Sequence, residues 1–172
     1  MSKPAALSPF VNEAYRDFSR PEHRAAMQDA LASARAEFGK EYDILIAGNA
    51  HKGSGTFPSL NPSSPKEIVG LHQRATVEQA RQAVDAAHSF FPSWSAAPSA
   101  TRIELLVKAA ALLRQRKSEC NAWLVLEAGK NWPEAEADTC EAIDFCEYYA
   151  RLMERLANPE AVAAGAHSSQ QF

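Results

Sequence analysis

Apolar side chains recur every three or four residues along most of the second half of the chain, a spacing typical of amphipathic helices. The pattern predicts four helices, over residues 76–91, 99–117, 118–128 and 131–153. We expect Pro92 to end the first of them. The buried faces predicted for the first two helices are Ala80, Ala83, Val84, Ala87, Phe90 and Phe91, and then Ile103, Leu106, Val107, Ala110 and Leu113.

Helix boundaries are marked by capping residues. Thr76 with Gln79, and Asn131 with Glu134, have the spacing of a capping box, in which each side chain bonds the other's backbone N–H. Gly129 separates the last two helices, because glycine readily takes the left-handed conformation that closes a helix.

The last helix has two distinct faces. One face is apolar and is predicted to be buried: Ala142, Phe145, Cys146, Tyr149 and Met153. The other face collects Glu134, Asp138, Glu141 and Tyr148 at the same steps.

The first half of the chain contains three kinds of pattern, which predict an extended arm, a helix and short strands. Residues 1–18 lack periodicity and predict an extended arm, with Phe10, Tyr15 and Phe18 as anchors. A helix follows, with a Ser19–Glu22 capping box and an end at Gly39. Its predicted apolar stripe is Met27, Ala30, Leu31, Ala34 and Phe38. Three short segments, 42–47, 57–60 and 68–71, then have the pattern of strands, with a turn signal at 48–49 between the first two.

Composition narrows the class of protein. The chain has 172 residues, 46% of them hydrophobic and 23% charged, which suits one ordinary globular domain. A net charge of −3 argues against nucleic-acid binding. No apolar run approaches the roughly 20 residues of a membrane span, and the N-terminus lacks a signal peptide's apolar core. We therefore expect a cytoplasmic protein with no membrane partner, whose three cysteines are reduced.

Several motifs resemble one enzyme family. The phrase EAGKNWPEAEADTCEAIDFCEYYAR, together with FGKEY, SLNPSSP and WLVLEAGKNW, resembles aldehyde dehydrogenases. It is most similar to the branch acting on L-glutamate γ-semialdehyde, the 1-pyrroline-5-carboxylate dehydrogenases. The resemblance runs from about Phe10 to about Glu160 and covers only the first third or so of a family member.

The resemblance implies an α/β fold of the aldehyde dehydrogenase type, of which this chain carries a mainly α-helical part with a small antiparallel strand region. We expect an N-terminal arm over 1–18, an incomplete dehydrogenase domain over 19–160, and a disordered tail outside the family pattern over 161–172. A frameshift or early stop is one explanation for the tail, and a genuine tail is another. In complete members these helices pack on the cofactor domain, so we expect exposed apolar surface and a tendency to self-associate or to be unstable.

The family's reaction is NAD-dependent oxidation of L-glutamate 5-semialdehyde to L-glutamate in proline degradation. The residues that the family uses for it, the nucleophilic cysteine, the base glutamate, the oxyanion asparagine and the glycine-rich turn, lie beyond the matched segment. The resemblance therefore assigns this chain no catalytic residue and no cofactor of its own, with NAD belonging to the complete enzyme. Cys120, Cys140 and Cys146 are interpreted as packing residues, and the five histidines show no metal-ligand spacing.

One site is carried over from the resemblance. Glu141 matches the position where semialdehyde dehydrogenases place a glutamate that holds the amino end of the substrate, and Phe145, one turn on, would wall its aliphatic part. A carboxylate suits an ammonium group because the ion pair adds charge-assisted hydrogen bonds. From spacing alone, the commoner interpretation is a solvated acidic helix face.

Two function classes remain open. The first is the N-terminal portion of the semialdehyde dehydrogenase, not catalytic by itself and meeting a small-molecule substrate only in a complete enzyme. The second is a non-catalytic interaction module that forms a homo-oligomer or pairs with a dehydrogenase chain.

Overall fold

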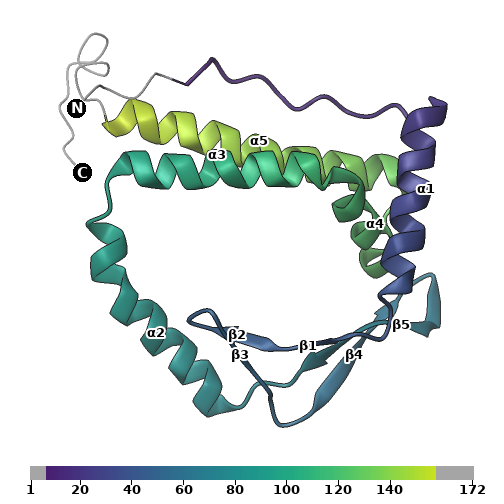
Figure 1. The fold of residues 1–172 in the computed structure, drawn as a ribbon, viewed down its shortest axis with the longest axis horizontal. Coiled ribbons are helices and arrows are strands. Elements are labelled where there is room, and N and C mark those ends of the chain that lie inside the picture. The colour runs from purple at the N-terminus through teal and green to yellow at the C-terminus, as the bar shows by residue number, and fades with distance from the viewer. Residues whose placement is uncertain (1–6, 158–172) are drawn as a thin grey trace. The chain divides into compact units, whose positions relative to one another are not determined.

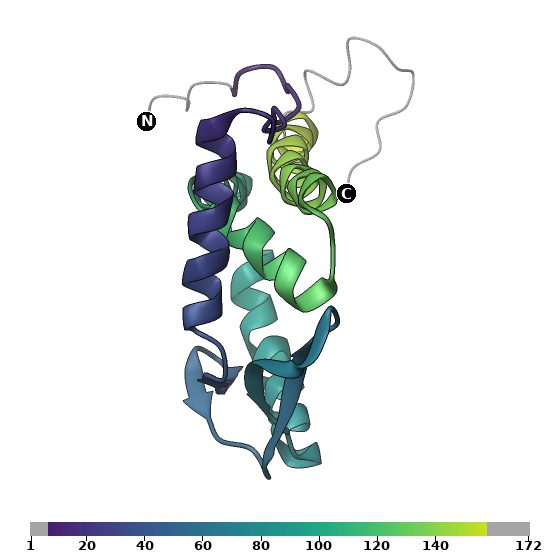
Figure 2. The same ribbon diagram turned by 90° about the vertical axis from the view of Figure 1, so that its right-hand side faces the viewer.

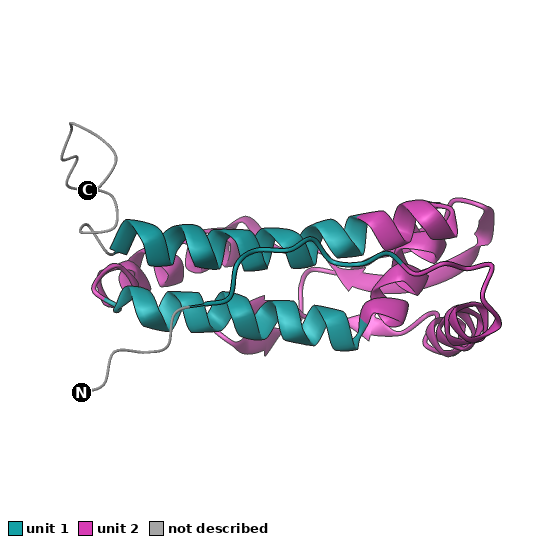
Figure 3. Ribbon diagram, turned by 90° about the horizontal axis from the view of Figure 1, so that it is seen from above, with its two compact units in different colours: residues 1–15, 97–116, 138–172 teal, residues 16–96, 117–137 magenta. Residues whose placement is uncertain are grey.

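The structure is a computed structural model that describes residues 7–157, and these divide into two units (Figure 3). Unit 1 contains residues 1–15, 97–116 and 138–172, and unit 2 contains residues 16–96 and 117–137. The tail predicted over 161–172 lies outside the described residues. The elements, labelled in Figure 1, are α1 (Pro21–Ala36), β1 (Glu41–Tyr42), β2 (Ile44–Ile46), β3 (Asn49–His51), β4 (Thr56–Asn61), β5 (Ser64–Gln73), α2 (Val77–Ser95), α3 (Ser99–Gln115), α4 (Lys117–Ala128) and α5 (Trp132–Ala157).

The core of unit 2 lies between α1 and α4, which pack side by side (Figure 2). Its buried members are Met27, Ala34, Ala122 and Leu126. Seven partly buried residues surround them: Phe18, Ala30, Leu31, Phe38, Trp123, Val125 and Trp132. This confirms the apolar stripe predicted for the first helix. Phe18 anchors the chain as expected, with its ring 5.4 Å from that of Trp132.

Two of the three predicted capping boxes are confirmed. Thr76 and Gln79 bond each other's backbone N–H groups at the start of α2. At the start of α5, the Asn131 side chain accepts from the Glu134 N–H at 2.9 Å, and Glu134 accepts from the Asn131 N–H at 3.3 Å. Gly129 ends α4 with φ of 70°, as predicted.

The prediction of a Ser19–Glu22 capping box is wrong. Helix α1 begins at Pro21, its N-cap is Arg20, and no side chain caps it. The Ser19 N–H instead bonds the Asp17 side chain at 2.9 Å. Because the helix begins at Pro21, the N-cap position falls on Arg20, whose side chain has no oxygen to accept a hydrogen bond from the first turn.

Unit 2 holds two small sheets, one of three strands in the order β1-β5-β4 and one of β2 with β3. Pairing of β4 with β5 is antiparallel, as predicted, and so is that of β2 with β3, but β1 runs parallel to β5. Strand β3 was not predicted, because Asn49–His51 carries no apolar alternation. The β2–β3 turn uses residues 47–48, one position earlier than expected, with φ of 51° and 80°. Positive φ at both turn positions matches the twist of a two-residue hairpin.

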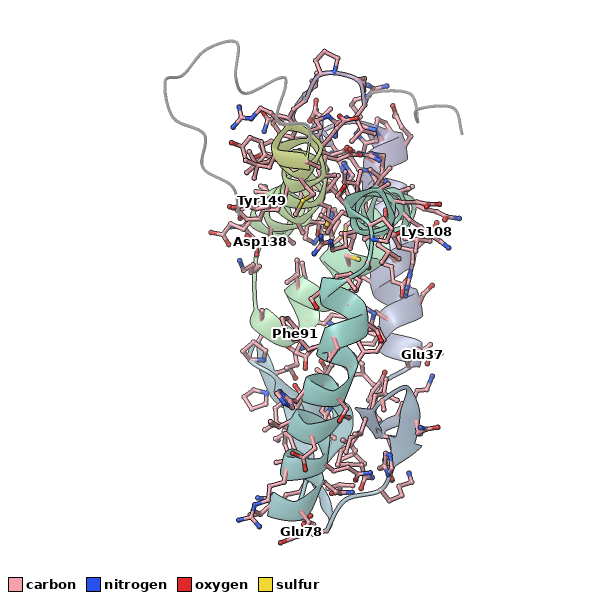
Figure 4. All side chains as sticks on the ribbon, turned by 90° about the vertical axis from the view of Figure 1, so that its left-hand side faces the viewer. Glu37, Glu78, Phe91, Lys108, Asp138 and Tyr149 are labelled. Carbon is pink, nitrogen blue, oxygen red and sulfur yellow. The ribbon has the colours of Figure 1, made fainter. Side chains whose placement is uncertain are left out.

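The predicted buried face of α2 is wrong. No residue of this helix is buried, and Val84 is 68% exposed. Phe90 and Phe91, the latter labelled in Figure 4, are also exposed. Among residues 7–157 the helix packs mainly against β2, and its apolar stripe stays exposed. Exposed apolar surface was itself predicted and is confirmed here. Pro92 lies inside the helix rather than ending it.

The buried face of α5 is also displaced from the predicted one. Phe145 and Tyr149 are each 51% exposed, whereas Cys140, Ile143 and Ala150 are fully buried. The prediction chose the most apolar stripe. The helix instead turns inward the stripe that contains Cys140, Ile143 and Ala150.

Residues 7–15 form an extended segment along α5, which we call the strap (Figures 1 and 3). Helix side chains bond its backbone. The Leu7 N–H lies 3.3 Å from both carboxylate oxygens of Glu154, and Arg151 Nε donates to the Ser8 carbonyl at 2.6 Å. Extended backbone with no neighbouring strand has to find such partners.

Farther along the strap, Asp144 accepts from the Glu13 N–H and from the Asn12 side chain, each at 2.7 Å. The Glu13 carboxylate pairs with Arg114 of α3 at 2.8 Å, and Arg114 also reaches Glu147 of α5 at 3.2 Å. The strap, α3 and α5 of unit 1 are thereby joined by one chain of charges. Tyr15, predicted as an anchor, is 70% exposed instead.

Met27 fills the centre of the unit 2 core, and a Met27→Ala substitution should lower the free energy of unfolding by about 2–5 kcal/mol because it leaves a cavity. Urea unfolding of the purified chain measures this loss. Val84→Ala, on the exposed face of α2, is the matched control and should change stability by less than about 0.5 kcal/mol. Equal losses for the two variants would contradict the burial pattern.

Candidate functional site

The predicted site residues Glu141 and Phe145 both lie on the exposed side of α5, in unit 1. They are one helical turn apart, so both side chains share a face. Tyr148 and Tyr149 extend that face by another turn (Tyr149 is labelled in Figure 4). We call these four residues the acid–aromatic face.

The rings of this face touch one another. Phe145 stacks on Tyr149 with ring centroids 5.9 Å apart, and Tyr149 meets Tyr148 edge-on at 5.5 Å. The strap adds Phe10, whose ring meets Tyr148 edge-on at 5.6 Å. Exposed aromatic side chains on one helix face are unusual in a packed monomer and mark a surface suited to binding.

The Glu141 carboxylate makes no hydrogen bond or ion pair within residues 7–157. Glu134, on the same helix, is committed to the capping box with Asn131. An exposed carboxylate beside an aromatic ring suits an amine with an aliphatic body, because the carboxylate binds the ammonium while the ring covers the methylenes. Sequence reasoning named Glu141 and Phe145 but missed the two tyrosines, since it predicted Tyr149 to be buried.

A second polar cluster, in unit 2, is buried and has a different role. Lys117 Nζ lies 3.1 Å from the Glu136 carboxylate, and both side chains are at most 5% exposed. Asn121 donates to Glu136 at 2.7 Å, and so does the Arg16 N–H at 2.9 Å. Because its acceptors and donors are matched inside the protein, this cluster joins α4, the start of α5 and residue 16 rather than binding a ligand.

The electrostatics of Glu136 reflect this cluster. Burial acts to raise the pKa of its carboxyl, but the Arg16 N–H, Asn121 and Lys117 together hold that pKa below its ordinary value. Glu147 of unit 1 behaves alike: burial raises its pKa, and hydrogen bonds from Arg151 and Arg114 outweigh burial and lower it.

Cys120, Cys140 and Cys146 all lie within the described part of the chain, on α4 and α5, and no disulfide joins them. Cys140 is fully buried, and its thiol approaches the Ala14 carbonyl of the strap at 3.9 Å. Packing is therefore its role here. Among residues 7–157, no three His, Cys, Asp or Glu side chains are placed to hold a metal ion. Within the same range, no helix is both long and apolar enough to cross a bilayer.

Comparison with known proteins decides the family. The sequence model of the aldehyde dehydrogenase family matches residues 49–171. The chain belongs to the aldehyde dehydrogenase family. The matched range includes most of the segment that sequence reasoning placed outside the family pattern.

Two curated members of the family show how much of it this chain represents. The 1-pyrroline-5-carboxylate dehydrogenase 2 of Halalkalibacterium halodurans is 42% identical over 147 residues, which are 86% of this chain and 28% of that protein. The 1-pyrroline-5-carboxylate dehydrogenase of Bacillus subtilis is 39% identical over 163 residues, 95% of this chain and 32% of that protein. The chain thus spans about three-tenths of the length of these dehydrogenases.

Solved dehydrogenase structures agree with the fold. A 1-pyrroline-5-carboxylate dehydrogenase from Thermus with bound NAD has a TM-score of 0.87 and 43% identity, covering 97% of this chain and 31% of its own. The corresponding enzyme from Mycobacterium tuberculosis, bound with NAD, has a TM-score of 0.79 and 27% identity, covering 91% of this chain and 30% of its own. The fold of this chain is therefore of the aldehyde dehydrogenase type, mostly helical with small mixed sheets.

The described residues do not fit the NAD that these dehydrogenase relatives bind. A dinucleotide pyrophosphate needs a glycine-rich turn from a parallel strand into a helix whose first N–H groups are available. Strand β5 leads into α2 through Arg74, Ala75 and Thr76, with no glycine. The Gln79 N–H at that helix start is bonded to the Thr76 side chain at 3.2 Å.

The burial and pairing of Glu136 predict how the free energy of unfolding depends on pH. Glu136→Gln should lower the free energy of unfolding by about 3–5 kcal/mol at neutral pH, because it breaks the buried ion pair with Lys117. The folded-state pKa of Glu136 is depressed, so its stabilisation is full above its unfolded pKa of about 4.3 and is lost as the pH falls through the folded value.

The stability difference between wild type and Glu136→Gln should therefore shrink below about pH 4. Urea unfolding at a series of pH values measures it. Glu104→Gln, an exposed carboxylate on α3, is the control and should follow the wild type throughout. A difference independent of pH would show that Glu136 is not ionised in the folded chain.

Proposed function

We propose that this chain is the N-terminal portion of an NAD-dependent dehydrogenase that oxidises L-glutamate 5-semialdehyde, the open form of 1-pyrroline-5-carboxylate, to L-glutamate in proline degradation. The observation that carries the proposal is the 38–43% identity, over most of the chain, to eight 1-pyrroline-5-carboxylate dehydrogenases. The Glu141 carboxylate, which has no partner within residues 7–157, supports it together with Phe145, since that pair suits the amino end and the methylenes of this substrate.

In this proposal the chain supplies substrate binding, and the missing part of the enzyme supplies the chemistry. Glu141 holds the substrate ammonium through an ion pair, and the Phe145 ring lies along its aliphatic chain. The nucleophile, the base and the hydride acceptor NAD belong to the remainder of the enzyme. The chain by itself is therefore not catalytic.

The test is reconstitution. Purified chain is mixed with the part of the Halalkalibacterium halodurans relative that it does not cover, and NADH formation from glutamate semialdehyde is followed. Activity should require both parts. Activity of the chain alone, above a heat-inactivated sample, would overturn the division of roles, and a mixture that forms no NADH would overturn the proposed function.

Within an active mixture, Glu141→Gln should raise KM for the semialdehyde about 10- to 100-fold and change kcat less, because a charge-assisted bond is worth about 1.5–3 kcal/mol. Glu104→Gln removes the same charge from an exposed site on α3 and should leave KM unchanged. Equal effects of the two substitutions would show that Glu141 acts only through net charge.

A second function has its own supporting observation. The exposed stripe of α2, with Val77, Val84, Phe90, Phe91 and Trp94, suits a non-catalytic interaction module that pairs with a dehydrogenase chain or with another copy of this one. Large exposed apolar patches commonly mark such surfaces.

If pairing uses α2, then the double substitution Phe90→Ser with Phe91→Ser should weaken association at least tenfold, because burying one phenylalanine is worth about 1.5–3 kcal/mol. Sedimentation of the chain, alone and mixed with the intact Bacillus subtilis relative, measures association. Leu112→Ser, at an equally exposed position of α3, is the control. A chain that stays monomeric and unbound in both samples would exclude the interaction module.

A further inference from the structure

We infer that Phe10 of the strap is a positioning residue for the substrate wall: it holds Tyr148, Tyr148 holds Tyr149, and Tyr149 fixes the ring of Phe145. All four rings belong to unit 1. The inference rests on the proposed function and deepens it, because it assigns part of the substrate-binding geometry to a residue more than a hundred positions away in the sequence.

The strap is anchored on both sides of Phe10. Before it, Arg151 Nε donates to the Ser8 carbonyl at 2.6 Å. After it, Asp144 accepts from the Asn12 side chain and from the backbone N–H of the next residue, each at 2.7 Å. An extended chain fixed at two points this close has little freedom to slide between them. The register therefore determines which residue of α5 the Phe10 ring meets.

That residue is Tyr148. Phe10 and Tyr148 meet at an interplanar angle of 81°, and Tyr148 meets Tyr149 at 78°. Both are edge-to-face contacts, which direct the positive edge of one ring to the negative face of the other. Such contacts depend on orientation, so each ring restricts the angle that the next one takes.

The last contact reaches the proposed substrate wall. Phe145 and Tyr149 are four residues apart on α5 and stack at an interplanar angle of 28°. Phe145 is 51% exposed, so no core holds its ring, and Tyr149 is the aromatic neighbour that does. Glu141 lies four residues before Phe145 on the same exposed side of α5. Loss of Phe10 should thus free Tyr148 and Tyr149 and widen the range of Phe145 orientations.

The first test uses the chain alone and needs no activity. The eight phenylalanines are replaced biosynthetically by 4-fluorophenylalanine, and the Phe145 resonance is assigned with Phe145→Leu. Phe10→Leu should shift and broaden that resonance, whereas Tyr15→Leu, an exposed strap position without a ring contact, should leave it unchanged. An unmoved Phe145 resonance in folded Phe10→Leu would overturn the inference.

A second variant protects the test against a folding defect. Tyr149→Leu changes an exposed position and breaks the contact next to Phe145. The Phe145 resonance should shift in this variant and should then no longer respond to Phe10→Leu. Phe10→Tyr keeps the ring and should restore the wild-type spectrum. A Phe145 resonance that responds to Phe10→Leu even without Tyr149 would show that the rings do not act in series.

The second measurement separates this inference from the proposed function. In an active reconstituted mixture, Phe10→Leu should raise KM for the semialdehyde about 2- to 10-fold with kcat nearly unchanged, the size expected from losing one aromatic pair. A shifted resonance with unchanged KM would overturn the positioning role. If no mixture is active, the proposed function fails and Phe145 walls no substrate, so the positioning role fails with it, while the fluorine spectra still decide whether the rings are coupled.

Discussion

An extended segment that is not part of a sheet must find partners for its backbone amides, and here the carboxylates of one helix supply them. Glu154, Asp144 and, in unit 2, Glu136 accept from the N–H groups of Leu7, Glu13 and Arg16. A carboxylate is a strong acceptor for such amides. These bonds hold the strap along α5, whose aromatic side remains about half exposed. The candidate site lies on that exposed side.

Local sequence signals predicted the structure correctly where it depends only on residues that are close in the sequence. The capping boxes of α2 and α5, the glycine after α4 and the α1 stripe depend on residues within a turn or two of one another, and all were predicted. Helical periodicity failed for α5 because it ranked the face with Phe145 and Tyr149 as the most apolar, whereas Cys140, Ile143 and Ala150 are the buried residues. The exposed stripe of α2 has the same periodicity as a buried one, so only the partner's absence within residues 7–157 distinguishes them.

The parallel pairing of β1 with β5 and the hairpin strand β3 could not be predicted from the sequence, for a related reason. Both depend on which segments meet in space, and two- or three-residue strands carry too few side chains to show an alternation. Glu141 and Phe145 were named through a family resemblance rather than through spacing. Their neighbours Tyr148 and Tyr149 were visible in the sequence, but their role depends on exposure, which the sequence does not record.

The mode of strap binding has a consequence for how this region tolerates change. Most of the hydrogen bonds described join side chains of α5 to backbone atoms of the strap. The position of the strap therefore depends on the side chains of the helix and on the spacing between the anchor points. Side chains such as Val11, which points away at 79% exposure, are free to vary. A single inserted or deleted residue between Ser8 and Asn12 is different, because it would present another side chain to Tyr148 while keeping every anchor chemically intact. The number of residues between these anchor points therefore matters more than the identity of the exposed side chains.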